Sequence, residues 1–586
     1  MFIRFCIISL LWLATAAGVQ AQDVAAAPAA ELTTAQKIDA AVRPVADAVS
    51  GFIFSSVRVG GTEDAPVMFP LIVGWLILAA LIFTFYFGFI NIRGFKHGFD
   101  LIRGKYSDPS SAGEVSHFRA LTSAVSGTVG LGNIAGVAVA ITIGGPGATF
   151  WMILAGLLGM SSKFVECTLG VMYRIEKPDG TISGGPMYYL SRGIAKNYPK
   201  AAWFGMVLAI VFAVCTMLGA IGAGAMFQAN QAFAQLSNVA GSVMPANGSL
   251  WFGLVYAVLG GVVVIGGITR IGSVTAKLVP GMAALYLLGA LFVILTNLPQ
   301  VPGAFMAILD GAFTAEGVSG GVIGALIQGF RRASFSNEAG LGSAAIAHSA
   351  VKTREPLSEG FVALWEPFID TVVICTMTAL VIIITNQHLV GGADGVQLTS
   401  NAFATASPLL PYALAFVVLL FAFSTTITWA YYGAKACSFL FKESKAALYG
   451  FKFFYLAMAV VGCTMPLASI VDIADGLLFI MAIPNLIGVY LLMPVVKREM
   501  DSYFARLKSG QLRISAVAFV LSDGHFLLAD FTGFHCMHNG TARVRNVLTI
   551  SELATAKPGR KLGKTAGNFV GSQMPQRELA NARRVN

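Results

Sequence analysis

Charged residues are scarce in this sequence: only 12% of its 586 residues are Asp, Glu, Lys or Arg. A soluble domain normally carries about 25%. Hydrophobic residues make up 56% of the chain, and its mean hydropathy is +0.73. Its 64 glycines would weaken soluble helices, but membrane helices use glycine for close contact. This composition excludes an ordinary soluble enzyme and predicts an all-α protein that crosses the membrane many times.

The sequence also lacks the signals of a disulfide framework, a zinc site or a cofactor. Its seven cysteines are scattered, and none belongs to a CxxC pair. The net charge is +10, but residues 506–586 alone hold twelve Lys or Arg against four Asp or Glu. Because the positive charge lies in this tail and in particular loops, we do not expect a nucleic-acid partner.

The N-terminus has the pattern of a secretory signal peptide. Arg4 precedes a short apolar run, and small residues lead up to Ala21, so residues 1–21 are predicted to be cleaved. A first membrane helix is the alternative, although the run is short of the roughly 20 residues that span a bilayer. Residues 22–66 are then expected to form a periplasmic segment.

Eleven apolar segments follow and predict eleven membrane spans. They lie near residues 69–90, 120–143, 148–172, 202–236, 249–268, 278–298, 318–349, 361–385, 411–439, 447–470 and 477–496. We interpret residues 67–91 as an extra first helix, 117–298 and 318–500 as two groups of five helices, and 501–586 as a basic cytoplasmic tail.

Basic residues are missing from every second connection between these spans. No Lys or Arg occurs in residues 144–147, 237–248, 299–317, 386–410 or 471–476, whereas every other connection carries them. Lys and Arg are enriched in cytoplasmic loops. The pattern therefore predicts a multi-pass protein of a bacterial inner membrane, with a periplasmic N-terminus and a cytoplasmic C-terminus.

The first span of each group of five is interrupted by small residues. The interruptions are Ser126-Gly-Thr-Val-Gly-Leu-Gly-Asn-Ile-Ala-Gly136 and Ser334-Phe-Ser-Asn-Glu-Ala-Gly-Leu-Gly-Ser343. Because five is odd, equivalent spans of the two groups cross the membrane in opposite directions. Gly-interrupted spans at matching places of inverted halves indicate the binding site of a secondary transporter. The glycines could instead serve only close helix packing.

A break inside the bilayer frees backbone groups, which is tolerated where they line a cavity. Freed carbonyls suit a sodium ion, and the amides at the start of a half-helix suit a carboxylate. Asn133 lies beside the first break, where it could bind a cation or an ammonium. Gln228 could bond substrate or another helix. Thr425 and Trp429 share a helix face beside Thr426, so hydroxyls could bind a cation while the indole limits substrate size.

Charged side chains within the spans need partners. Arg331, Arg332 and Glu338 lie in the seventh span, and Glu366 and Asp370 lie in the eighth. We expect Arg331 or Arg332 to pair with Glu366 or Asp370 as a structural brace. A proton relay through the acidic residues is the alternative.

Several motifs resemble those of the alanine or glycine:cation symporter family, the sodium:alanine symporters. They are Gly130-Leu-Gly-Asn-Ile-Ala-Gly136, Gly144-Gly-Pro-Gly-Ala148, Gly184-Gly-Pro-Met-Tyr188, Gln228-Ala-Asn230 and Ser336-Asn-Glu-Ala-Gly-Leu-Gly-Ser-Ala344. The resemblance runs from about residue 69 to 500. It implies a leucine-transporter-like fold of two inverted five-helix repeats, with sodium as the coupling ion and alanine, D-alanine or glycine as substrate.

On matching positions, the resemblance implies two sets of site residues. Sodium would lie against Gly130, Asn133, Thr425 and Thr426, and substrate would lie among Gly132, Gln228, Asn337, Thr425 and Trp429. Leu131 stands where many members have a hydroxyl residue, so coupling to protons remains the alternative to sodium.

Two other classes of protein are disfavoured. A membrane-embedded enzyme would need a clustered catalytic set, and the spans contain His348 as their only histidine, with no HExxH or GxSxG motif. A channel would need a pore lined by charge rings or a repeated filter. We therefore predict a secondary transporter that imports a small neutral amino acid with sodium by alternating access.

Overall fold

The computed structural model describes residues 34–512, except 62, 64–65, 107–110, 246, 265–266 and 315–320, together with 517–520 and 526–529. The predicted signal peptide and most of the basic tail lie outside the described residues. The chain divides into two units, residues 1–515 and 516–586. In the second unit, β5 (Val517–Val520) and β6 (Phe526–Ala529) pair as an antiparallel hairpin.

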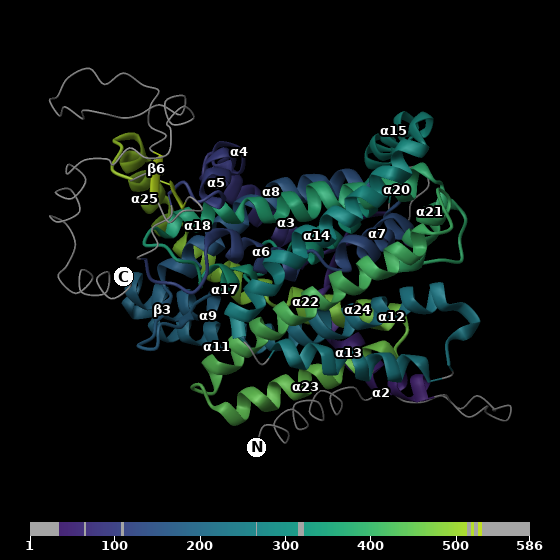
Figure 1. Ribbon diagram of the computed structural model, residues 1–586, viewed down its shortest axis with the longest axis horizontal. Helices are drawn as coiled ribbons and strands as arrows, with labels where there is room; N and C mark the ends of the chain where they lie inside the picture. The colour runs from purple at the N-terminus through teal and green to yellow at the C-terminus, as the bar shows by residue number, and fades with distance from the viewer. Residues whose placement is uncertain are drawn as a thin grey trace, which may run out of the picture. The chain divides into compact units, whose positions relative to one another are not determined.

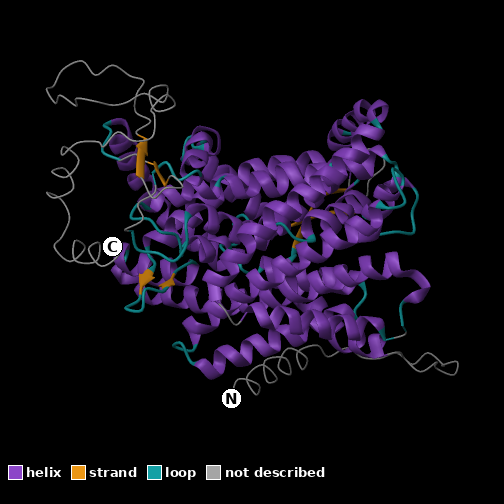
Figure 2. Cartoon of the chain, viewed as in Figure 1, coloured by secondary structure: helices purple, strands orange, loops and turns teal. Residues whose placement is uncertain are grey.

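Helices make up nearly all of the first unit (Figure 2). Before the first predicted group of five, the chain forms α2 (Thr34–Ile53), the hairpin β1 (Ser56–Gly61) and β2 (Pro66–Pro70), α3 (Leu71–Tyr86), α4 (Ile90–Arg93) and α5 (Phe95–Ile102).

The first predicted group contains a broken helix, two long helices, a short hairpin and several π-helical turns. Its elements are α6 (His117–Thr128), η1 (Gly132–Gly136), α7 (Val137–Gly144), α8 (Ala148–Met172), β3 (Ile175–Glu176), β4 (Ile182–Ser183), α9 (Pro186–Tyr188), η2 (Tyr189–Gly193), α10 (Ile194–Asn197), η3 (Pro199–Ala201), α11 (Ala202–Gly219), η4 (Ala220–Met226), α12 (Phe227–Ala240), η5 (Gly241–Val243), α13 (Gly248–Val264) and α14 (Gly267–Thr296).

The rest of the unit is helical. Its elements are η6 (Leu298–Gln300), α15 (Val301–Phe313), α16 (Gly321–Asn337), α17 (Ala344–His348), α18 (Pro356–Ala363), α19 (Trp365–Pro367), η7 (Phe368–Cys375), α20 (Thr376–Ile384), η8 (Gln387–Leu389), α21 (Gly395–Ala404), α22 (Leu410–Leu440), α23 (Lys445–Cys463), α24 (Leu467–Phe479) and α25 (Ala482–Lys508).

Most of the long helices in this bundle could span a membrane. Among the described residues, seven helices are long and apolar enough to cross a bilayer, and the bent pair His117–Thr128 and Gly132–Gly144 gives an eighth. The apolar helices α3 and α13 are shorter. Each of the eleven predicted segments coincides with helical structure, whereas the count of eleven spans stays a prediction.

Apolar side chains cover the outside of the bundle as well as its interior. Trp203 and Val207 on α11, Val258 and Leu259 on α13, and Leu288 on α14 are all exposed. A run of exposed apolar residues on neighbouring helices would be unfavourable in water. Facing lipid, the same residues are in their preferred solvent, so the all-α membrane fold expected from the composition is confirmed.

Two long helices organise the interior. Helix α8 contacts α16, α17 and α18, and α22 contacts α6, α12 and α14. In Figure 1, α22 lies between α14 and α12. Glycines permit this closeness: a Cβ at Gly360 of α18 would lie 2.1 Å from Thr168 Oγ1 of α8. The broken helices α6–η1–α7 and α16–α17 are packed against these two long helices.

Several elements outside the eleven predicted segments were not predicted, and α2 is one of them. It forms within the segment 22–66, for which the sequence predicted a periplasmic location and no particular structure, and it packs on α24. The ring of Phe54, just after α2, lies 5.4 Å from that of Phe479. The Ala-rich segment around α2 contains no apolar run long enough to indicate a membrane span. Its packing partner, α24, lies more than 400 residues away in the sequence, so local sequence patterns could not predict this contact.

Candidate substrate and ion site

The first break joins α6 to η1 at an angle of 53°. Residues 129–131 leave the α-helix, and two side chains accept hydrogen bonds from the backbone amides that become free. Asn133 Oδ1 accepts from the Gly130 amide at 2.9 Å, and Gln228 Oε1 accepts from the Leu131 amide at 3.0 Å. The break is therefore stabilised by neutral amide groups, as a buried backbone without water requires.

Thr425 of α22 lies against the carbonyl side of the same break. Its Oγ1 donates to the Ser126 carbonyl at 3.0 Å and lies 3.5 Å from the Val129 carbonyl oxygen. A Cβ at Gly130 would lie 2.5 Å from Thr425 Oγ1 and 3.0 Å from Gln228 Oε1. Glycine at position 130 therefore leaves space for the Thr425 hydroxyl and the Gln228 side-chain amide to lie directly against the backbone of the break.

The second break follows α16 and is a turn rather than a bend. Glu338, Gly340 and Gly342 all have positive φ angles, of 57°, 89° and 81°. The Glu338 carboxylate accepts a hydrogen bond from Trp429 Nε1 at 3.0 Å and another from Ser343 Oγ. A left-handed glutamate is uncommon outside functional or tightly constrained positions.

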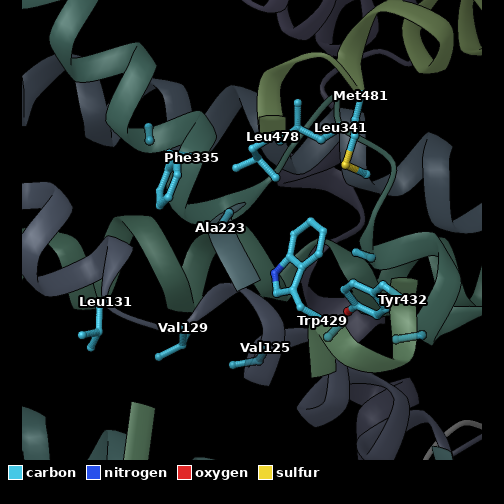
Figure 3. Close-up of a cluster of buried hydrophobic side chains, with 14 of the residues drawn as sticks. Val125, Val129, Leu131, Ala223, Phe335, Leu341, Trp429, Tyr432, Leu478 and Met481 are labelled. Carbon is cyan, nitrogen blue, oxygen red and sulfur yellow. The ribbon is translucent and has the colours of Figure 1, made fainter. Parts of the chain in front are cut away.

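The two breaks face a small buried cavity. Ten residues line it: Gly127, Thr128, Gly132, Ala223, Gln228, Phe335, Glu338, Thr425, Trp429 and Leu478. Its volume is about 10 Å³, which is room for about one water molecule. Figure 3 shows the indole of Trp429 near Ala223 and Leu478, with Phe335 across from it. Polar groups from both breaks therefore meet the Trp429 and Phe335 rings around one small space.

Four of the five predicted substrate residues line this cavity: Gly132, Gln228, Thr425 and Trp429. The fifth, Asn337, does not. Its Nδ2 donates to Thr371 Oγ1 at 2.9 Å, and its Oδ1 accepts from the Ala339 amide at 3.0 Å. The adjacent Glu338 takes its place in the cavity wall.

The residues predicted to bind sodium are divided among three environments. Gly130 and Thr425 meet at the first break. Asn133 Nδ2 is turned away and donates to Asp370 Oδ1 at 2.6 Å. Thr426 Oγ1 donates to the Gly224 carbonyl at 2.8 Å and lies 2.9 Å from the Tyr256 hydroxyl. A single shell containing all four residues is not formed.

The predicted charge pairs are wrong. Arg331 lies 2.7 Å from Asp475 Oδ2 of α24, and Arg332 pairs with the same carboxylate. Glu366 pairs instead with Lys163 of α8 at 3.0 Å. Asp370 forms no ion pair with either arginine and accepts a hydrogen bond from Ser336 Oγ at 2.8 Å.

The reason for this error is geometric. Helical spacing identifies residues that share a face, but not which helix packs against that face. Asp475 lay in a segment interpreted as an outward connection, and the structure places it within α24.

A cavity between two broken helices, inside a helical membrane bundle, defines a membrane transporter. Residues 56–516 match the sodium:alanine symporter family, and the chain belongs to this family.

Three relatives illustrate the similarity. The sodium/alanine symporter AgcS of Methanococcus maripaludis is 37% identical over 75% of this chain and 94% of its own. The probable sodium/glutamine symporter GlnT of Bacillus subtilis is 33% identical over 75% of this chain and 89% of its own. The amino-acid carrier protein AlsT of Bacillus subtilis is 36% identical over 74% of this chain and 90% of its own.

A solved structure of MhsT in complex with L-phenylalanine aligns with 65% of this chain and 89% of its own, at 15% identity and a TM-score of 0.49.

Proposed function

We propose that this protein imports a small neutral amino acid, alanine or glycine and including D-alanine, together with sodium. The observation that carries the proposal is the cavity shared by the two helix breaks, lined by Gly132, Gln228, Thr425 and Trp429. Membership of the sodium:alanine symporter family supports both the substrate class and the ion.

The substrate carboxylate would bind at Gly132. This glycine begins the helical segment Gly132–Gly144 and lines the cavity. The amides of residues 133–136 already donate to the Gly130 and Leu131 carbonyls, so the Gly132 amide is the one that would bind the carboxylate. Trp429 and Phe335 close the apolar side of the cavity. The cavity is smaller than an amino acid in this conformation, so it would have to widen to admit substrate. With these two rings in its wall, we expect it to favour a small side chain and to exclude larger amino acids.

Sodium would bind at the first break. The Ser126 and Val129 carbonyls and the Thr425 hydroxyl converge within 3.5 Å there, and oxygen ligands suit a hard cation. Asn133 would act indirectly, because its hydrogen bond to the Gly130 amide holds the shape of the break. Thr426 is turned to Gly224 and Tyr256, so we leave it out of this ion site.

Transport would proceed by alternating access in a bacterial inner membrane. The absence of Lys and Arg from every second connection supports a periplasmic N-terminus and a cytoplasmic C-terminus. We infer that the groups 117–298 and 318–500 are inverted repeats, because each opens with a broken helix. Rocking of one bundle against the other would then expose the cavity to each side in turn.

The test is uptake of radiolabelled L-alanine into proteoliposomes. With an inward sodium gradient, the purified protein should accumulate alanine, and unlabelled glycine should compete while phenylalanine should not. A potassium gradient of equal size and protein-free vesicles are the controls. Accumulation that is the same with sodium and potassium would exclude sodium coupling.

Proton coupling is the second candidate, and a buried chain of titratable groups favours it. His117 Nδ1 lies 2.5 Å from Glu359, which lies 2.6 Å from His348 Nδ1. His348 Nε2 lies 3.4 Å from Glu366, whose other oxygen is 3.0 Å from Lys163. Chains of this kind carry protons in some transporters. An inward proton gradient without sodium would drive alanine uptake only if this second candidate is correct.

A further inference from the structure

We propose that the Glu338 carboxylate binds the α-ammonium group of the transported amino acid. This inference rests on the proposed function. It gives a substrate-binding role to Glu338, whereas the sequence motifs indicated its neighbour Asn337. It follows from three observations. Glu338 lies in the cavity wall, its hydrogen-bond partners are neutral, and the other buried carboxylates of the described residues either pair with basic groups or lie outside the cavity.

Glu338 is buried, and both of its known contacts are neutral. Trp429 Nε1 donates to one carboxylate oxygen at 3.0 Å, and Ser343 Oγ donates to the other. Within the described part of the chain, Glu338 forms no ion pair with Lys, Arg or His. Neutral donors orient a carboxylate but do not neutralise its charge. A buried charge without a counter-charge has a large free-energy cost inside a membrane.

Three of the five other buried carboxylates in the described part of the chain have basic partners. Glu366 pairs with Lys163, Glu359 with two histidines, and Asp475 with two arginines. Among the described residues, Glu166 and Asp370 resemble Glu338 in lacking a cation. However, neither lines the cavity: Asn485 Nδ2 donates to Glu166 at 2.6 Å, and Asp370 accepts from three neutral donors.

Glu338 is therefore the carboxylate that a ligand in the cavity can reach. The ligand must bring positive charge to it, and it must also bring a carboxylate for the Gly132 amide from the other break. A zwitterionic amino acid supplies both groups on a single carbon, its Cα. Each break would then hold one end of the substrate, with the first binding the anion and the second the cation.

The backbone and side chain of Glu338 are both held in place, as this role requires. Its left-handed backbone lies between α16 and the two positive-φ glycines, and the Trp429 indole fixes one carboxylate oxygen. Trp429 is thus a positioning residue for Glu338 as well as a wall of the cavity. A fixed charge binds an ammonium group without having to reorganise when the substrate arrives.

The experiment compares L-alanine with L-lactate, which has the same carboxylate and methyl group but a hydroxyl in place of the ammonium. Equilibrium binding of both is measured on the purified full-length protein and on Glu338→Gln, which keeps the size and an acceptor for Trp429. Glu166→Gln is the matched control, because it also removes a buried carboxylate charge but lies outside the cavity. Melting temperature and monodisperse elution verify that both variants fold.

Wild type should bind alanine at least about 30-fold more tightly than lactate, in keeping with the value of a buried charge pair. Glu338→Gln should lose about 30-fold or more in alanine affinity and bind lactate more tightly than wild type does. Glu166→Gln should keep the wild-type preference for alanine.

Several outcomes would overturn the proposal. One is unchanged alanine affinity in Glu338→Gln, and another is a shift in sodium affinity alone, which would make Glu338 an ion ligand. A change confined to the pH dependence would make it a proton site. If Glu338→Gln does not fold, equal binding of lactate and alanine by wild type rejects the proposal. Because the assay measures binding, a failure of sodium-driven uptake remains a separate result.

Discussion

The two helix breaks differ in both backbone and charge. Between Ser126 and Gly136 no residue has a positive φ angle and no side chain is charged, so the first break is a π-helical bend stabilised by amides. The second break has three positive φ angles, and its turn carries Glu338. It follows α16, whose Arg331 and Arg332 pair with Asp475 of α24.

This difference separates two ways of opening a helix inside a membrane. A neutral break stabilised by side-chain amides can exchange one hydrogen-bond partner for a ligand at low cost. The second break is a defined turn, and ion pairs on the preceding helix hold it to α24, so it resists rearrangement. We therefore expect the first break to adapt during transport and the second to act as a rigid support. The following variants test this distinction.

The largest effect is expected from Asp475→Asn. The change leaves Arg332 buried without a counter-charge and should lower the free energy of unfolding by about 3–5 kcal/mol. Melting temperature in detergent measures the loss. The control is Asp501→Asn, which removes an exposed pair with Lys497 and should change stability by less than about 1 kcal/mol. Equal melting temperatures for the two variants would show that charge does not brace the second break.

A smaller effect is expected from Gly342→Ala. At φ +81° an alanine is strained, which costs about 1–2 kcal/mol. Its Cβ would also lie 2.7 Å from Asn485 Oδ1 and from Pro186 Cγ. The matched variant is Gly136→Ala in the first break, where φ is −64° and no heavy atom lies within 4 Å of the added Cβ.

We expect Gly342→Ala to melt at a lower temperature than wild type and Gly136→Ala to melt at the same temperature or slightly above it. Similar losses in both variants would contradict the contrast between a turn and a bend.

The positions of both breaks were predictable because clusters of glycine within apolar segments are a local signal. The partners of Arg331 and Arg332 were not, since pairing with Asp475 depends on where α24 packs. The difference between Asn337 and Glu338 was equally inaccessible. The left-handed conformation of Glu338 redirects the chain, so that Asn337 faces Thr371 while the next side chain faces the cavity. A backbone angle of this kind has no counterpart in composition or periodicity.

A smaller loss of stability than that of Asp475→Asn or Gly342→Ala is expected from Thr426→Val, which removes a hydroxyl without changing the shape of the side chain. Thr426 forms hydrogen bonds with the Gly224 carbonyl and the Tyr256 hydroxyl and does not contact the first break. Loss of its hydroxyl should therefore cost about 1 kcal/mol and leave the sodium dependence of alanine uptake unchanged.

Thr425→Val changes the neighbouring threonine and is the matched comparison. It removes the hydroxyl at the Ser126 and Val129 carbonyls, and the sodium concentration for half-maximal uptake should rise about tenfold or more, because the ion loses one of its oxygen ligands. An equal sodium shift in both variants would mean that the ion site extends from the first break to Gly224, and that the neutral break does not bind the ion alone.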